Sequence, residues 1–87
     1  MKIVDGFVLK TIADTHVVVP VGDNSVSFRA IISLNDSGAF LWNNLQEETD
    51  EDALVKALTA EYDVDEATAR ADVKEFVETM KKANIIA

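Results

Sequence analysis

The stretch Ala30–Leu45, AIISLNDSGAFLWNNL, contains one abrupt change of hydrophobic period. Apolar residues alternate up to Leu34, which is the pattern of a strand with one buried face. After Asp36 they recur at three- and four-residue spacing, which predicts a helix. We therefore expect a strand over Val26–Leu34 that leads directly into a helix from Asp36 to about Gln46.

Polar residues mark the junction between this strand and this helix. Asn35, Asp36 and Ser37 carry side-chain oxygens that can accept hydrogen bonds from the unpaired amides of a helix start. Trp42 follows at helical spacing, and we expect it to fill the space between the two elements.

Two further strands are predicted upstream, at Phe7–Ile12 and His16–Pro20, because both segments are rich in β-branched and apolar residues. Ala13–Thr15 is short enough for a hairpin loop, so the two strands should pair antiparallel. The turn-rich segment Val21–Ser25 then leads into the third strand.

Two further helices are predicted downstream. One is capped near Thr49 and ends near Tyr62, and the other is capped by Asp65 and ends near Asn84. The outline is a three-stranded antiparallel sheet followed by three helices, in a single α+β domain over residues 1–87.

The composition excludes several classes of function. The chain of 87 residues has no Cys, which excludes disulfides and thiolate chemistry, and it has no apolar run long enough to span a membrane. We expect a cytoplasmic protein. The net charge of −8 is concentrated between residues 47 and 66 and disfavours nucleic-acid binding.

No residue pattern indicates catalysis. His16 stands at a strand start, Ser37 lacks the preceding glycine of a nucleophile elbow, and the acidic residues lack the spacing of a calcium loop. We expect neither an enzyme nor a bound metal or cofactor.

Two surfaces are candidates for binding another chain. At about 100° per residue, the last helix carries a core stripe next to a basic stripe. The core stripe contains Ala69, Val73, Phe76 and Met80. The basic stripe contains Arg70, Lys74, Lys81 and, on its boundary with the core, Val77.

The third strand supplies the other surface, because a sheet edge accepts an added strand. Arg29, Ala30, Ile31, Ile32 and Ser33 form the candidate segment. An edge beside an amphipathic helix makes a groove for an extended peptide, and the cations of the helix would select an apolar and acidic one.

The chain resembles the PqqD-like family of small peptide-binding proteins over nearly its whole length. The resemblance is carried by Leu34-Asn35, Gly38, Trp42 and Leu45, by the stripe Leu54, Leu58 and Tyr62, and by Ala71-Asp72-Val73 before Phe76 and Met80. Gln46-Glu47 and Asn84 depart from the family pattern at turn positions.

The resemblance implies a winged-helix-like fold that binds the leader segment of a ribosomally made precursor peptide. It also implies presentation of that peptide to a modifying enzyme, often a radical SAM enzyme. The leader is expected to add to the third strand at Ala30–Ser33 and to lie against the last helix. On the helix the expected contacts are Arg70, Lys74, Val77 and Lys81.

Three alternatives stay open. A winged-helix DNA-binding module shares the outline but would need a more basic recognition helix. An acyl carrier protein is suggested by the acidity and by Asp36-Ser37, although the strands argue against it. A dimerisation module could pair through the same edge, so the protein is expected to be a monomer or a weak homodimer.

Overall fold

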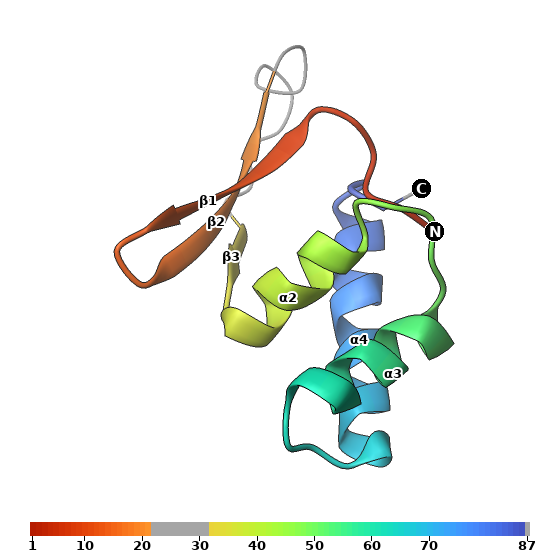
Figure 1. The fold of residues 1–87 in the computed structure, drawn as a ribbon. Helices are drawn as coiled ribbons and strands as arrows, with labels where there is room; N and C mark the ends of the chain where they lie inside the picture. Colours follow the sequence, from red (N-terminus) through yellow and green to blue (C-terminus); the bar gives the residue numbers. More distant parts are fainter. Residues whose placement is uncertain (22–31, 87) are drawn as a thin grey trace.

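The structure, a computed structural model, describes residues 1–21 and 32–86 (Figure 1). Its strands are β1 (Phe7–Ile12), β2 (Thr15–Pro20) and β3 (Ile32–Leu34). Its helices are α2 (Asp36–Asn44), α3 (Glu51–Glu61) and α4 (Glu66–Lys82). This is the predicted α+β layout, and it fits a winged-helix-like fold.

The strands form an antiparallel sheet in the order β1-β2-β3. β1 and β2 form the predicted hairpin, which projects from the helical body in Figure 1, and β3 pairs with the first half of β2. The register sets Leu9 opposite Val18 and places the latter in the core. β3 therefore has β2 on one side and, among the described residues, no strand on the other.

The expected third strand covered Val26–Leu34, and its first part, residues 26–31, lies outside the described residues. Ile32–Leu34 is the part that the structure confirms as a strand. Asn35 then turns the chain from β3 into α2, and its side chain accepts a hydrogen bond from the amide of Gly38 at 2.8 Å. The predicted direct passage from strand to helix is confirmed.

Each of the other two helices begins at an Asp cap. The Asp65 carboxylate accepts from the amide of Thr68 at 2.7 Å, as its predicted capping role requires. The cap of α3 is Asp50, one residue after the predicted Thr49. Thr49 precedes the cap, and its amide donates to the carbonyl of Met1.

The Asp65 cap makes the stability of α4 dependent on pH. Hydrogen bonds from the amide and the hydroxyl of Thr68 lower the pKa of Asp65 below its ordinary value. The stabilisation is thus present above the unfolded pKa and is lost as the pH falls through the folded pKa. Asp65→Asn keeps a capping oxygen that does not titrate. We expect the melting temperature of this variant, measured by circular dichroism, to fall less than that of the wild type between pH 5 and about pH 2. An identical fall in both proteins would contradict the assignment.

The core lies between the sheet and the three helices. It contains Ile3, Val18, Leu41, Trp42, Leu45, Leu54, Val55, Leu58, Ala69, Val73, Val77, Met80, Ile85 and Ile86. Trp42 is 2% exposed, as expected.

The N-terminal segment joins the ends of the helices, and both termini lie on the same side of the molecule (Figure 1). The amide of Ile3 donates to the carbonyl of Leu45, and the amide of Val4 donates to the carbonyl of Ile85. Ile3 also forms an antiparallel bridge with Ile86. These bonds fix the C-terminal end of α4 and therefore the orientation of that helix. No helix in the described ranges is long and apolar enough to cross a membrane.

Candidate peptide-binding groove

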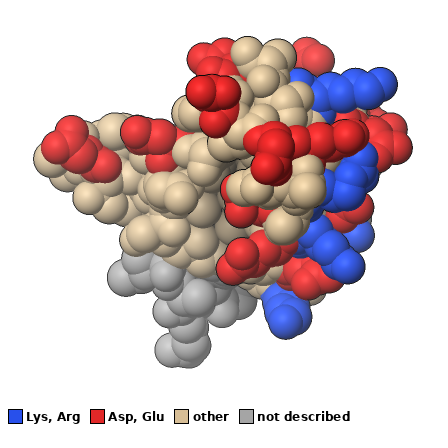
Figure 2. Space-filling view, turned by 90° about the horizontal axis from the view of Figure 1, so that it is seen from below, with Lys and Arg blue, Asp and Glu red and all other residues tan. Residues whose placement is uncertain are grey.

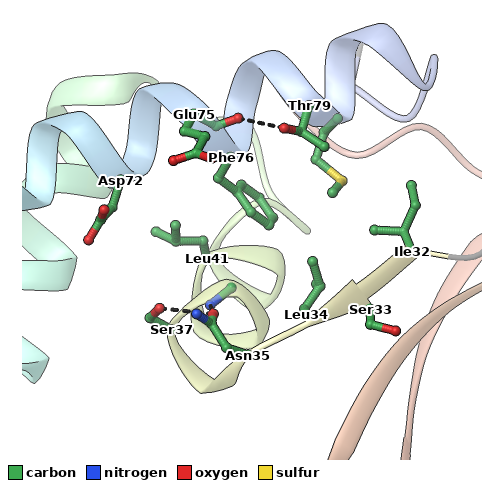
Figure 3. Close-up of a pocket in the computed structure, with 12 residues that line it drawn as sticks. Ile32, Ser33, Leu34, Asn35, Ser37, Leu41, Asp72, Glu75, Phe76 and Thr79 are labelled. Carbon is green, nitrogen blue, oxygen red and sulfur yellow. Dashed lines mark hydrogen bonds between the residues drawn. The ribbon is translucent and has the colours of Figure 1, made fainter.

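A groove of about 470 Å³ lies between β3, the start of α2 and one side of α4 (Figure 3). Its lining residues are Ile32, Ser33, Leu34, Asn35, Ser37, Gly38, Leu41, Asp72, Glu75, Phe76, Thr79 and Met80. We call it the β3–α4 groove. It adjoins the edge of β3 that has no partner strand within the described part of the chain, so that an added strand would lie over it.

The lining of the β3–α4 groove combines apolar and polar side chains. In Figure 3 the side chains of Ile32 and Leu34 point from β3 toward α4, and the ring of Phe76 reaches from α4 toward Leu41. Ile32, Leu34 and Phe76 are each half-buried, and all three pack against the core. Their buried parts are held by the core, and their exposed parts are apolar surface that a ligand could cover.

Gly38 lets α2 start close to β3. A Cβ added at Gly38 would lie 3.1 Å from the Cβ of Leu34 and 3.1 Å from Oδ1 of Asn35. These contacts are tighter than ordinary van der Waals contacts, so a larger residue at this position would require Leu34 or Asn35 to shift by a few tenths of an ångström. The glycine therefore fixes the end wall of the groove.

The rotation of α4 differs from the one that the sequence predicted. Its buried residues are Ala69, Val73, Val77 and Met80. Val77, predicted to lie on the boundary of the basic stripe, is 1% exposed in the core, whereas Phe76 is only half-buried. The core side of the helix is therefore rotated toward the basic stripe, because α3 packs against α4 on that side.

The predicted basic stripe borders α3 and not the β3–α4 groove. Arg70 pairs with Asp52 on α3 at 2.9 Å and with Glu66 one turn earlier at 3.5 Å. These two carboxylates, Asp52 first, raise the pKa of the Arg70 guanidinium. Lys81 lines a separate hollow beside the first turn of α3, and the exposed Lys74 does not line the groove.

Charge is therefore divided between the two sides of α4. The side toward the groove carries Asp72, Glu75 and Thr79 around Phe76, whereas Arg70 and Lys81 lie toward α3. Figure 2 shows one face of the molecule, on which Lys and Arg gather along the margin away from the hairpin, whereas Asp and Glu are spread over the whole face, that margin included.

The structure thus places the predicted site residues in three groups. Ile32 and Ser33 line the groove, as expected of the third strand. Residues 29–31, which include Arg29, Ala30 and Ile31, lie outside the described residues. The helix residues of the prediction, Arg70, Lys74, Val77 and Lys81, all lie away from the groove.

Sequence reasoning missed Phe76, Asp72, Glu75 and Thr79 as groove residues. Helical spacing does group them on one side of α4, and that signal was available. The sequence does not say, however, which flank of the core stripe faces the sheet. Only the packing of α4 against α3 determines that.

The polar residues considered for catalysis have structural partners. His16 Nε2 lies 2.8 Å from Asp36 Oδ1, and its Nδ1 lies 2.9 Å from Thr11 Oγ1, so the side chain links the hairpin to the start of α2. Ser37 donates to Oδ1 of Asn35. Within residues 1–21 and 32–86, no group of three His, Cys, Asp or Glu side chains gathers as a metal site.

Comparisons with known proteins point to one family. The family described as Coenzyme PQQ synthesis protein D (PqqD) matches residues 15–86. Among solved structures, the chain is similar to one titled "TbiB1 in Complex with the TbiA(beta) Leader Peptide", with a TM-score of 0.75 and 27% sequence identity. That match covers 98% of this chain and 93% of the other. No curated protein gives a significant match.

Proposed function

Because this chain belongs to the PqqD family, we propose that it binds the leader segment of a ribosomally synthesised precursor peptide in the β3–α4 groove. The leader adds as a strand to the free edge of β3, so its backbone bonds to the sheet. Alternate side chains of that strand point into the groove and contact the apolar surface of Ile32, Leu34 and Phe76.

One observation carries this proposal: β3, whose outer edge has no partner strand among the described residues, also lines the groove. An unpaired edge supplies affinity that does not depend on sequence, and the groove supplies selection among side chains. The similarity to a protein solved with a leader peptide supports the same function.

The proposed role is non-catalytic. The protein holds the precursor and presents it to a separate modifying enzyme, for which we propose a radical SAM enzyme. His16 and Ser37, the two side chains considered as catalytic groups, serve the connection between sheet and helix, which supports a binding function.

A titration followed by NMR tests the proposed function. Synthetic leader segments of precursor-like peptides are added to the isotopically labelled protein, and amide shifts are mapped onto the structure. We expect the largest shifts in Ile32–Leu34 and on the groove side of α4 around Phe76. Shifts confined to the outer side of the β1–β2 hairpin would place the binding site elsewhere.

The position of the basic residues gives a second prediction. The sequence pattern predicts that Lys74→Glu with Lys81→Glu weakens leader binding, whereas the structure predicts that it does not, because neither side chain lines the groove. We expect the dissociation constant, measured by fluorescence anisotropy with a labelled leader, to rise by no more than about twofold. A tenfold rise, about 1.4 kcal/mol, would restore these lysines to the binding surface.

A further inference from the structure

Among the charged residues of α4 within the described ranges, Arg70 is ion-paired, whereas the two carboxylates that line the groove are not. Arg70 is paired with Asp52 and Glu66. Asp72 and Glu75, on the groove side, have no cation within ion-pair distance in the part of the chain that the structure describes. The lining of the groove contains these two carboxylates and no Lys or Arg.

Asp72 lies where two hollows meet. It lines the β3–α4 groove and also a second hollow, on the side of α2 and α3, that contains Asn35, Ser37 and Tyr62. In Figure 3 its carboxylate extends from α4 on the side of Ser37, across the end of the groove. A chain that left the groove at this end would therefore pass next to the carboxylate.

We propose that the segment bound in the β3–α4 groove carries a Lys or Arg two residues from an apolar anchor, with Asp72 and Glu75 as the groups that recognise the cation. This inference rests on the proposed function and specifies its ligand: an apolar and basic leader segment. It reverses the acidic preference that the sequence pattern suggested, because the groove is lined by two carboxylates and by no Lys or Arg, and Arg70 and Lys81 lie toward α3.

The spacing of two residues follows from the geometry of the two elements. Side chains on one face of a strand repeat every two residues, or about 6.6 Å. Positions 72 and 76 of α4 are separated by four residues, or about 6 Å along the helix axis. An added strand that follows α4 thus sets one side chain at Phe76 and its same-face neighbour at Asp72.

Binding of the peptide would also strengthen the electrostatic attraction between its cation and the carboxylates of Asp72 and Glu75. The two carboxylates are exposed in the free protein, so water screens them. A peptide laid over the apolar surface around Phe76 excludes part of that water, and a charge pair at its margin is then less screened. The same carboxylates repel a leader with an acidic residue at that position, so they select as well as bind.

Selection from a random peptide library tests the preference and does not require the leader to be identified. Displayed random peptides of about 15 residues are selected on the immobilised wild-type protein. We expect the enriched sequences to contain Lys or Arg two residues from a large apolar residue. Enrichment of Asp or Glu at that position, or of neutral residues only, would overturn the inference.

A charge-matched pair of variants then tests the residues. Asp72→Asn with Glu75→Gln should reduce the affinity for an enriched peptide about 3- to 10-fold at low salt, which is the range expected for the loss of ion pairs near the surface. Glu61→Gln with Glu78→Gln changes the net charge equally, but both side chains are exposed and outside the groove, so we expect less than a twofold effect. Equal effects of the two double variants would mean that only the overall charge matters.

Salt provides a further readout. The 3- to 10-fold difference should disappear near 1 M salt, where the Debye length is about 3 Å compared with about 10 Å at 0.1 M. A difference that persists at high salt would contradict charge recognition.

Phe76→Ala separates this inference from the proposed function. One outcome is that Phe76→Ala lowers the affinity for the enriched peptide while the double variant of Asp72 and Glu75 does not. The groove then binds peptides, but its carboxylates do not recognise a cation. If Phe76→Ala binds as the wild type does, or if no peptide is enriched, the groove is not the peptide site and the proposed function fails as well.

Discussion

Trp42→Ala is expected to lower the free energy of unfolding by about 3–5 kcal/mol, the range for loss of a large aromatic side chain from a core. Trp42 is 2% exposed, and it belongs to the cluster that joins all three helices to the sheet. Domains are stable by roughly 5–15 kcal/mol, and a chain of this length lies near the lower end. The substitution would therefore remove most of the stability of the protein.

Urea denaturation followed by far-ultraviolet circular dichroism measures this change. Trp42 is the single tryptophan of the chain, so intrinsic fluorescence would not compare the two proteins fairly. We expect a lower midpoint with a nearly unchanged slope. Val8→Ala is the control, because Val8 is exposed on β1, and a surface change of this kind costs about 0.5 kcal/mol or less. A Trp42→Ala protein as stable as the control would show that the side chain is not part of the core.

Phe76→Ala is expected to weaken leader binding by about two- to fivefold. Its ring lines the β3–α4 groove and is only half-buried in the free protein, so a ligand can cover the remainder. Full burial of a large apolar side chain contributes about 1.5–3 kcal/mol, and covering the exposed part of this ring contributes less than half of that, roughly 0.5–1 kcal/mol, which corresponds to about two- to fivefold in affinity. The ring also packs against the core, so some loss of stability accompanies the loss of affinity.

Fluorescence anisotropy with a labelled leader measures the binding, and circular dichroism at the same temperature establishes that the variant is folded. Ile12→Ala is the matched control, because Ile12 is an apolar residue at the end of the hairpin, 67% exposed and outside the groove. We expect its affinity to stay within about twofold of the wild type. A folded Phe76→Ala protein with wild-type affinity would move the site away from the groove.

Local patterns in the sequence predicted most of the fold correctly. β1 has its predicted bounds, and α2 begins directly after β3 at a cap that Asn35 provides. Asp65 caps α4 as expected. Such features depend on residues within a few positions of one another, so period and capping chemistry are sufficient to identify them.

The boundaries that were wrong depend on distant partners. α2 ends at Asn44, before the predicted Gln46. α3 is capped by Asp50, whose carboxylate accepts from the amide of Ala53, while Thr49 before it is bonded through its amide to Met1, which is remote in the sequence. Local propensity does not contain that contact.

The sequence by itself determined which residues of α4 share a side. One side carries Ala69, Val73, Phe76 and Met80, a second carries Arg70, Lys74, Val77 and Lys81, and the third carries Asp72, Glu75, Glu78 and Lys82. This follows from the helical period alone. Only the tertiary structure decided which of the two polar sides faces β3. Burial of Val77 and the pairing of Arg70 with Asp52 on α3 fix the rotation of α4, and these interactions between elements turn its carboxylates, not its cations, toward the groove.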